Sequence, residues 1–82
     1  MTTKQLGLQG VLNALAGTTN LGTVAAANAY AGTTGLGLLG ALNHKAGNSP
    51  AEWQDLNGVA NQLAGTSGLD ALRALNVAAG LE

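Results

Sequence analysis

The chain has 82 residues, of which 46% are hydrophobic, 2% aromatic and 9% charged, and its formal net charge is -1. This describes one small domain, 1–82, with a core of Leu, Val and Ala and a weakly charged surface that suits an assembly better than a free monomer. Lys4, Lys45 and Arg73 are too scattered for a nucleic-acid interface, no apolar run could span a membrane, and without Cys there is no disulfide or thiolate metal site.

The first predicted element is a helix over 6–16, whose apolar residues recur at helical spacing. It ends in Ala16-Gly17, and glycine is the usual residue for the left-handed position just past a helix end. Two residues later, Thr19 suits the N-cap of a following helix, because its hydroxyl can accept a bond from a free amide of the next first turn. The phrase therefore predicts a helix stop followed by a helix start.

The same phrase ends the next two predicted helices, 20–31 and 35–46, and it continues to the end of the chain. The Ala-Gly pairs stand 15, 15, 18 and 15 residues apart, and we number the repeat units one to five by their glycines: Gly17, Gly32, Gly47, Gly65 and Gly80. Eleven residues before its glycine, each unit has an opening residue: Leu6, Leu21, Leu36, Gln54 and Leu69. A repeat of this length has room for one helix.

The fourth predicted helix, 50–64, belongs to the unit that carries three extra residues. Its start signal is the strongest in the chain. Ser49 would be the N-cap, Pro50 would take the first helical position where its missing N–H costs nothing, and Glu52 would reach back to complete a capping box.

The fifth predicted helix, 68–79, repeats this box with Ser67 and Asp70. In each unit the bulky residues fall nine, eight, five and two positions before the glycine, which predicts one apolar stripe per helix. The expected fold is thus all-α, with five short helices joined by tight corners and packed as a compact bundle or a short solenoid. The expected caps are Thr19, Thr34, Ser49 and Ser67.

An asparagine recurs four residues before each glycine: Asn13, Asn28, Asn43, Asn61 and Asn76. Asparagine is a mediocre helix former, so its recurrence at one helical position indicates a positional role. We expect each amide to bond backbone groups left free at a neighbouring corner. The alternative is an exposed ladder of amides that binds sugar or a partner. With no unit after it, Asn76 is expected to matter less than the inner copies.

No catalytic, metal or cofactor site is expected, and the chain is predicted not to be an enzyme. His44 has no second His and no Cys beside it, and it is interpreted as a solvent-facing residue near a helix C-terminus. Glu52 and Asp55 are explained by capping. The phrase "GLGLLG" follows no strand, which argues against a phosphate-binding loop.

Two aromatic residues are possible contact residues. Trp53 lies in the three-residue insertion, where it either plugs the gap in the repeat or anchors a partner. Tyr30 replaces Leu at a position of the apolar stripe, and we expect it at the edge of the core with its hydroxyl outward.

The phrases "LNALAGTT", "AAANAYAGTTGLGLLGALNHKAG" and "GVANQLAGTSGL" resemble a repeat of the "GALN-x-x-AGTTGL" kind, found in virion proteins of phages that infect actinobacteria. The resemblance covers the chain from about Leu6 to Gly80. It implies a non-enzymatic structural or interaction module of the virion, in capsid decoration or as a minor tail protein. Its partners would be capsid or tail proteins or further copies of itself, and it implies no catalytic residues or cofactors.

A second hypothesis belongs to a different functional class. In this hypothesis the protein is a module that binds carbohydrate or cell wall through Trp53, Tyr30 and exposed asparagine side chains. Isothermal titration against actinobacterial cell-wall fragments separates the two hypotheses.

Overall fold

The computed structural model describes residues 6–81, and within that range it is entirely helical, with no strand. The α-helices are α1 (Leu8–Ala16), α2 (Thr23–Ala31), α3 (Leu38–Ala46), α4 (Leu56–Ala64) and α5 (Ala71–Ala78), and a short 3-10 helix, η1 (Pro50–Glu52), lies between α3 and α4. The predicted all-α fold of five short helices is confirmed. Lys4 lies outside the described residues.

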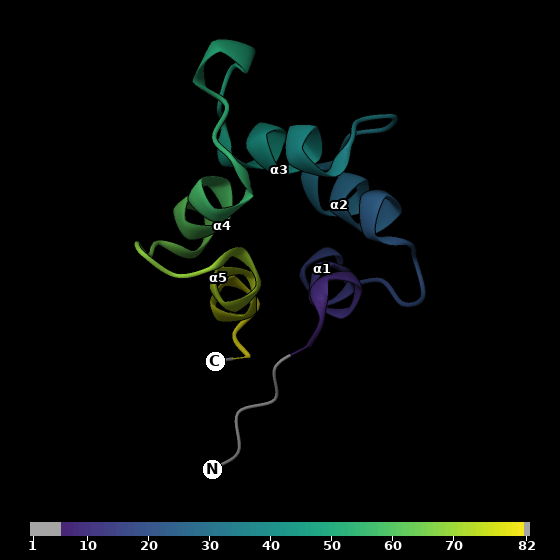
Figure 1. Cartoon of the computed structure of the whole chain (residues 1–82). Coiled ribbons are helices and arrows are strands. Elements are labelled where there is room, and N and C mark those ends of the chain that lie inside the picture. The colour runs from purple at the N-terminus through teal and green to yellow at the C-terminus, as the bar shows by residue number, and fades with distance from the viewer. Residues whose placement is uncertain (1–5, 82) are drawn as a thin grey trace.

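The five α-helices form a closed ring (Figure 1). Each helix packs on the helix before it and the helix after it, and α5 packs on α1. The shortest dimension of the molecule is 13 Å, close to the length of a nine-residue helix at about 1.5 Å per residue. The ring is therefore one helix thick, and the architecture is a solenoid that closes after five units.

Between helices the chain runs back along the helix it has just left, in what we call the return segment. In unit one, Asn13 Nδ2 donates to the carbonyl of Gln9, in the first turn of α1, and to the carbonyl of Leu21, in the return segment. The return segment has therefore come back level with the start of its own helix. Because the next helix begins from this level, successive helices run in the same direction.

The predicted helix stops are confirmed in units one to four. Gly17, Gly32, Gly47 and Gly65 have φ of 73°, 74°, 84° and 72°. The residue after each glycine bonds back to the carbonyl of the repeat asparagine, as Thr18 N does to Asn13 O at 2.9 Å. A left-handed glycine followed by such a bond is the Schellman motif, which satisfies carbonyls that a helix end leaves free. In unit five the last helical residue is Ala78, but the predicted stop is present as well, because Gly80 has a φ of 77° and Leu81 N donates to Asn76 O at 2.9 Å.

The predicted helix starts at Thr19, Thr34 and Ser67 are wrong. Each helix begins three residues later than predicted, and the N-cap positions are held by Gly22, Gly37 and Asp70. The physical reason is the return segment: the N–H and C=O of its opening residue are both bonded to the preceding asparagine side chain, which holds the chain extended there.

The predicted helix 50–64 is interrupted. Ser49 and Glu52 form the expected capping box, with Glu52 Oε1 accepting from Ser49 N at 3.2 Å, but the box starts only η1. The chain is extended at Trp53, and α4 begins after a separate cap in which Asp55 Oδ1 accepts from Gly58 N at 2.8 Å. The three extra residues thus project from the ring as a loop (Figure 1).

The second predicted capping box, Ser67 with Asp70, does not form. Asp70 is itself the N-cap residue of α5, and its side chain makes no capping bond. The first amide of α5, Ala71 N, instead donates to Asn57 Oδ1 on α4 at 2.8 Å. A neighbouring helix therefore provides the cap.

The core is one cluster to which all five helices contribute. In each unit the residues six and five positions before the glycine are buried: Val11, Leu12, Ala26, Ala27, Ala41, Leu42, Val59, Ala60, Ala74 and Leu75. At the second of these positions leucine and alanine alternate along the chain. Neighbouring helices therefore pair a large side chain with a small one at this position, except between α5 and α1, where Leu75 and Leu12 are both leucine.

The predicted apolar stripe is partly wrong. The position eight before the glycine lies on the surface, where Val24, Leu39 and Leu72 are 49%, 36% and 36% exposed. The positions two and nine before it are mostly half-buried. In a ring, only a narrow strip of each helix faces the centre, so the small alanines six before the glycine are buried while larger residues remain outside.

The junction between α5 and α1 is closed by the same bonds as the others. Leu6 N donates to Asn76 Oδ1 at 2.9 Å, and Asn76 Nδ2 donates to Leu6 O at 3.1 Å. Asn28 makes the corresponding pair with Leu36, at 3.2 and 2.7 Å. The expectation that Asn76 lacks a following unit is therefore wrong, because unit one follows it in space.

We expect Asn76→Ala to destabilise the protein about as much as Asn43→Ala, since both amides are fully buried. Each change strands buried backbone groups at a cost of about 1–3 kcal/mol, which lowers Tm by several degrees or more. Thermal unfolding followed by far-ultraviolet circular dichroism measures this. Asn20→Gly is the matched control, because glycine stands at the equivalent exposed positions Gly35 and Gly68. A clear loss for Asn43→Ala with none for Asn76→Ala would mean that the ring is open in solution.

Ring closure also predicts that the chain tolerates circular permutation. Joining Leu81 to Leu6 through Thr-Asn reproduces the spacing between Gly17 and Leu21, and new ends between Pro50 and Ala51 fall in the projecting loop. We expect this permutant to keep the helical circular dichroism spectrum and a cooperative melt. A permutant opened between Leu42 and Asn43, inside α3, should not fold, and equal behaviour of the two would contradict the ring.

Candidate functional site

The repeat asparagines use their hydrogen-bonding groups within the ring. In unit one, Asn13 Nδ2 donates to Gln9 O at 2.8 Å and to Leu21 O at 3.0 Å. Its Oδ1 accepts from Thr18 Oγ1 at 2.7 Å and from Leu21 N at 3.1 Å. An amide has two donors and two acceptor lone pairs, so this side chain has no capacity left.

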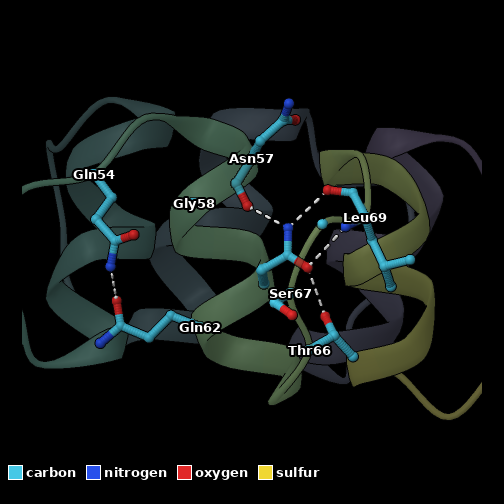
Figure 2. A pocket seen from close by; sticks show the side chains of 9 residues that line it. Gln54, Asn57, Gly58, Gln62, Thr66, Ser67 and Leu69 are labelled. Carbon is cyan, nitrogen blue, oxygen red and sulfur yellow. Dashed lines mark hydrogen bonds between the residues drawn. The ribbon is translucent and has the colours of Figure 1, made fainter.

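The same four bonds recur around the other inner asparagines. Asn28 and Asn61 accept from Thr33 and Thr66, each at 2.7 Å. In unit four Asn61 Oδ1 accepts from Thr66 Oγ1 and Leu69 N, and Asn61 Nδ2 donates to Leu69 O. The dashed lines that reach Thr66 and Leu69 mark these bonds (Figure 2). Asn76 makes three of the four bonds, since its equivalent of Thr18 is Leu81, which has no hydroxyl.

The asparagines therefore cannot form an exposed binding ladder. Their exposed fractions lie between 0 and 8%, and, within residues 6–81, no buried side-chain nitrogen or oxygen lacks a partner. Each amide joins the backbone of its own helix to the backbone of the next unit, as the structural interpretation of the repeat expects.

The connection between α3 and α4 adapts this arrangement to the three-residue insertion of unit four. Asn43 pairs with the backbone of Gln54, accepting from its N at 2.9 Å and donating to its O at 3.1 Å. Asn48 replaces threonine and donates to Asn43 Oδ1 at 2.9 Å. The side chains of Asn48, Gln54 and Gln62 then form an exposed amide cluster between α3 and α4.

An open groove lies beside the asparagine in units one, two and four, between the outer side of the helix and its return segment. The volumes are about 470, 720 and 520 Å³. Because these grooves recur at the same position of the repeat, they are the strongest candidate binding sites among the described residues.

The grooves differ in chemistry. The helix side of the unit-two groove is lined by Val24, Ala25 and Ala29. At the same positions unit four has Asn57, Gly58 and Gln62, which line a polar groove with Gln54 at one end (Figure 2). Unit one begins with Gln9. The unit-two groove is thus the apolar one.

Trp53 is half-exposed, at 46%, and does not belong to the core. Its ring lies against α3: a β-carbon placed on Gly40 would stand 3.0 Å from Trp53 Cη2. Trp53 combines features of both interpretations. One edge of its indole covers Gly40, as a gap-filling residue would, and nearly half of the side chain is exposed, as a contact residue would be.

Tyr30 is half-buried at the end of α2, as expected for a residue at the core edge. Lys45 Nζ lies 4.9 Å from the centre of its ring, in a cation–π contact between α2 and α3. Burial raises the pKa of the Tyr30 hydroxyl. Tyr30 is in the last turn of α2 and Trp53 lies against the first turn of α3, so the two aromatic residues sit toward opposite faces of the ring.

The ionisable residues are dispersed. His44 is exposed in the last turn of α3, as predicted, and Glu52 and Asp55 cap different elements. Residues 6–81 contain no cluster of three or more potential metal-ligating His, Cys, Asp or Glu side chains. Lys45 and Arg73 lie on α3 and α5, which are not neighbours in the ring.

None of the helices in the described part of the chain has the length and apolar character that crossing a membrane requires. Comparison of the chain with known protein families, curated proteins and solved structures found no match.

Two features of the repeat were missed from the sequence. The threonine directly after the glycine bonds the asparagine, as Thr18 does Asn13. The next residue, Thr19, which was predicted to be the cap, is exposed. Asn20, Gly35 and Gly68, three after the glycine, form a second left-handed position, with φ of 63°, 75° and 78°. The recurrence of Asn or Gly there is the signal that could have revealed it.

A matched pair of substitutions in unit two separates the two threonines. Thr33→Val keeps the side-chain shape but removes the hydroxyl that bonds Asn28, and we expect it to cost about 0.5–1.5 kcal/mol. Thr34→Val, at the exposed neighbour, should leave stability unchanged. Urea unfolding of both variants measures the difference. The reverse order would restore Thr34 as the helix cap.

Proposed function

We propose that the protein is a non-enzymatic structural or interaction module that works within a larger protein assembly. The observation that carries the proposal is the placement of apolar side chains on the outside. Val24, Leu39 and Leu72 are each the second residue of their helix and are 36–49% exposed. Because the helices run in the same direction, these side chains lie toward one face of the ring. Exposed apolar residues that recur toward one face of the ring are available for contact with another protein.

The chemistry of the surface supports the same proposal. Only 9% of residues are charged, and the cores of protein interfaces are depleted in charge. The five repeat asparagines are used up in holding the ring together, so they contribute rigidity rather than a binding surface. A rigid module that presents apolar side chains loses little conformational entropy when it docks.

We further propose that the assembly is a phage virion, with the module in capsid decoration or in the tail. This part of the proposal is supported by the resemblance of the phrases around Asn13, Asn28 and Asn61 to repeats of virion proteins from phages that infect actinobacteria. It would place the protein in the particle, bound to capsid or tail proteins or to further copies of itself.

Binding of carbohydrate or cell wall is the second candidate, and one observation favours it. The unit-four groove is lined by the amides of Gln54, Asn57 and Gln62, and the indole of Trp53 adjoins Gln54 in the chain with part of its ring exposed. Amides that hydrogen-bond hydroxyls, with an aromatic ring nearby, are the combination that this function needs.

Mass spectrometry of purified particles tests the leading proposal. We expect the chain in fixed stoichiometry with a shell or tail protein. Substituting Val24→Asn and Leu39→Asn, which copies the Asn57 found at this position in unit four, should reduce incorporation severalfold without lowering Tm, because both residues are exposed. His44→Asn, at an exposed site near the opposite helix end, is the control.

Absence from particles, together with saturable binding to actinobacterial cell-wall fragments in isothermal titration, would replace this proposal by the second candidate. In that case Gln62→Ala should weaken the binding, and the Val24→Asn and Leu39→Asn changes should not.

A further inference from the structure

We propose that the groove of unit two is a docking site for an aromatic side chain, a tryptophan above all, presented by a partner protein. The proposal deepens the interaction function proposed above and depends on it only in taking the occupant to come from a protein. The carrying observation is that the chain already fills the equivalent groove of unit three with its own tryptophan.

The grooves can be compared at the position seven residues before the repeat glycine. Gly10, Ala25 and Gly58 hold it in units one, two and four, and each lines the groove of its unit. In unit three it is Gly40, whose missing side chain would point at Trp53 Cη2, 3.0 Å away, and at Cζ2, 3.6 Å away. Trp53 itself stands directly before the opening residue Gln54, in the place of Asn20, Gly35 and Gly68 in the other units.

Burial agrees with this correspondence. Gly40 is buried, whereas Gly10 and Gly58 are only partly buried and Ala25 is exposed. The indole of Trp53 therefore covers a position that lines an open groove in units one, two and four. The repeat itself thus shows which chemical group the groove accommodates.

Unit two is the open groove whose chemistry suits such a ring. Val24, Ala25 and Ala29 give it an apolar helix side, and Leu36 lies at its far end. With a volume of about 720 Å³ it is larger than the grooves of units one and four. Units one and four carry Gln9, Asn57 and Gln62 at the corresponding places, so an aromatic ring would have to displace water from amides there.

The lining also indicates a neutral occupant. No charged residue lines the unit-two groove, so a cationic or anionic side chain would be desolvated without a partner. Thr33 already donates to Asn28, whereas Thr34 is exposed at the rim and its hydroxyl can accept the N–H of an indole. Tryptophan combines a large apolar surface with one such donor.

The probe for the test is N-acetyl-tryptophanamide, titrated into the ¹⁵N-labelled full chain and followed by NMR. We expect saturable shifts centred on the amides of Ala25, Ala29 and Gly35, and affinity about tenfold weaker for N-acetyl-alaninamide, equivalent to about 1.4 kcal/mol. The V24N/A29Q variant copies the lining of unit four and changes two exposed residues. It should fold normally and lose the shifts in unit two.

Trp53→Ala supplies an independent arm, because it uncovers the groove beside Gly40. In this variant the same probe should also shift the amides of Gly40 and Asn43, and a tryptophan-containing peptide should do the same while its alanine counterpart does not. If Trp53→Ala is too unstable, Trp53→Leu leaves part of the groove covered and should show a smaller effect.

Several results would overturn the proposal. Absence of shifts in unit two, equal shifts in the V24N/A29Q variant, or equal binding of the alanine probe would each show that the groove does not select an aromatic ring. Concentration-dependent shifts of unit two without any probe, abolished by Trp53→Ala, would show that the occupant is a second copy of this chain rather than a partner protein. The presence of the unaltered chain in purified particles is independent of these outcomes.

Discussion

The pairing between a buried asparagine amide and the backbone of the next unit's opening residue is the interaction on which the ring depends. It fixes two things at once. The N–H and C=O of residues such as Leu21 are satisfied, so an extended return segment can pack against a helix without stranding its backbone. The same bonds set the register between successive units, because a shifted chain would leave both the amide and the backbone unpaired at a cost of about 1–3 kcal/mol per group.

Closure of the ring follows from applying this pairing once more. The bond pair between Asn76 and Leu6 joins residues 70 apart in sequence. A domain of this size has a modest core, and this chain has no cysteine for a disulfide and only 2% aromatic residues to compensate. Closing the ring gives every helix two neighbours, so no unit leaves its apolar edge uncovered, as the terminal repeats of an open solenoid do.

The three-residue insertion between α3 and α4 shows how far the repeat can be altered. Gln54 takes the opening position and keeps both backbone bonds to Asn43, so the three extra residues are accommodated outside the ring. The loop then places Trp53 over Gly40. A change that leaves the framework intact therefore fills one groove of the repeat, while the neighbouring groove beside Ala25 stays open and apolar. In this fold the asparagines hold the units together, and the residues that differ between units line the grooves.

The sequence by itself determined the repeat, the helical class and the helix ends. The left-handed backbone at a helix end, such as φ of 73° at Gly17, favours glycine for local steric reasons, so the residue type alone predicts it. The positional role of the asparagines was also readable, because their spacing is constant and their helix propensity is poor. The five opening residues were aligned correctly as well, although their purpose was not apparent.

Only the tertiary structure decided where the helices start, which side chains are buried and that the ring closes. Thr19 has the local chemistry of a cap. The chain beyond it is held extended, however, because Leu21 N donates to Asn13 Oδ1 in the preceding helix. Val24 looks like a core residue by periodicity, yet the curvature of the ring gives each helix too narrow an inner strip to bury it. The contact between Asn76 and Leu6 has no local signal, because whether five units complete a circle depends on the angle between neighbouring helices. That angle is set by the packing of all the core side chains together.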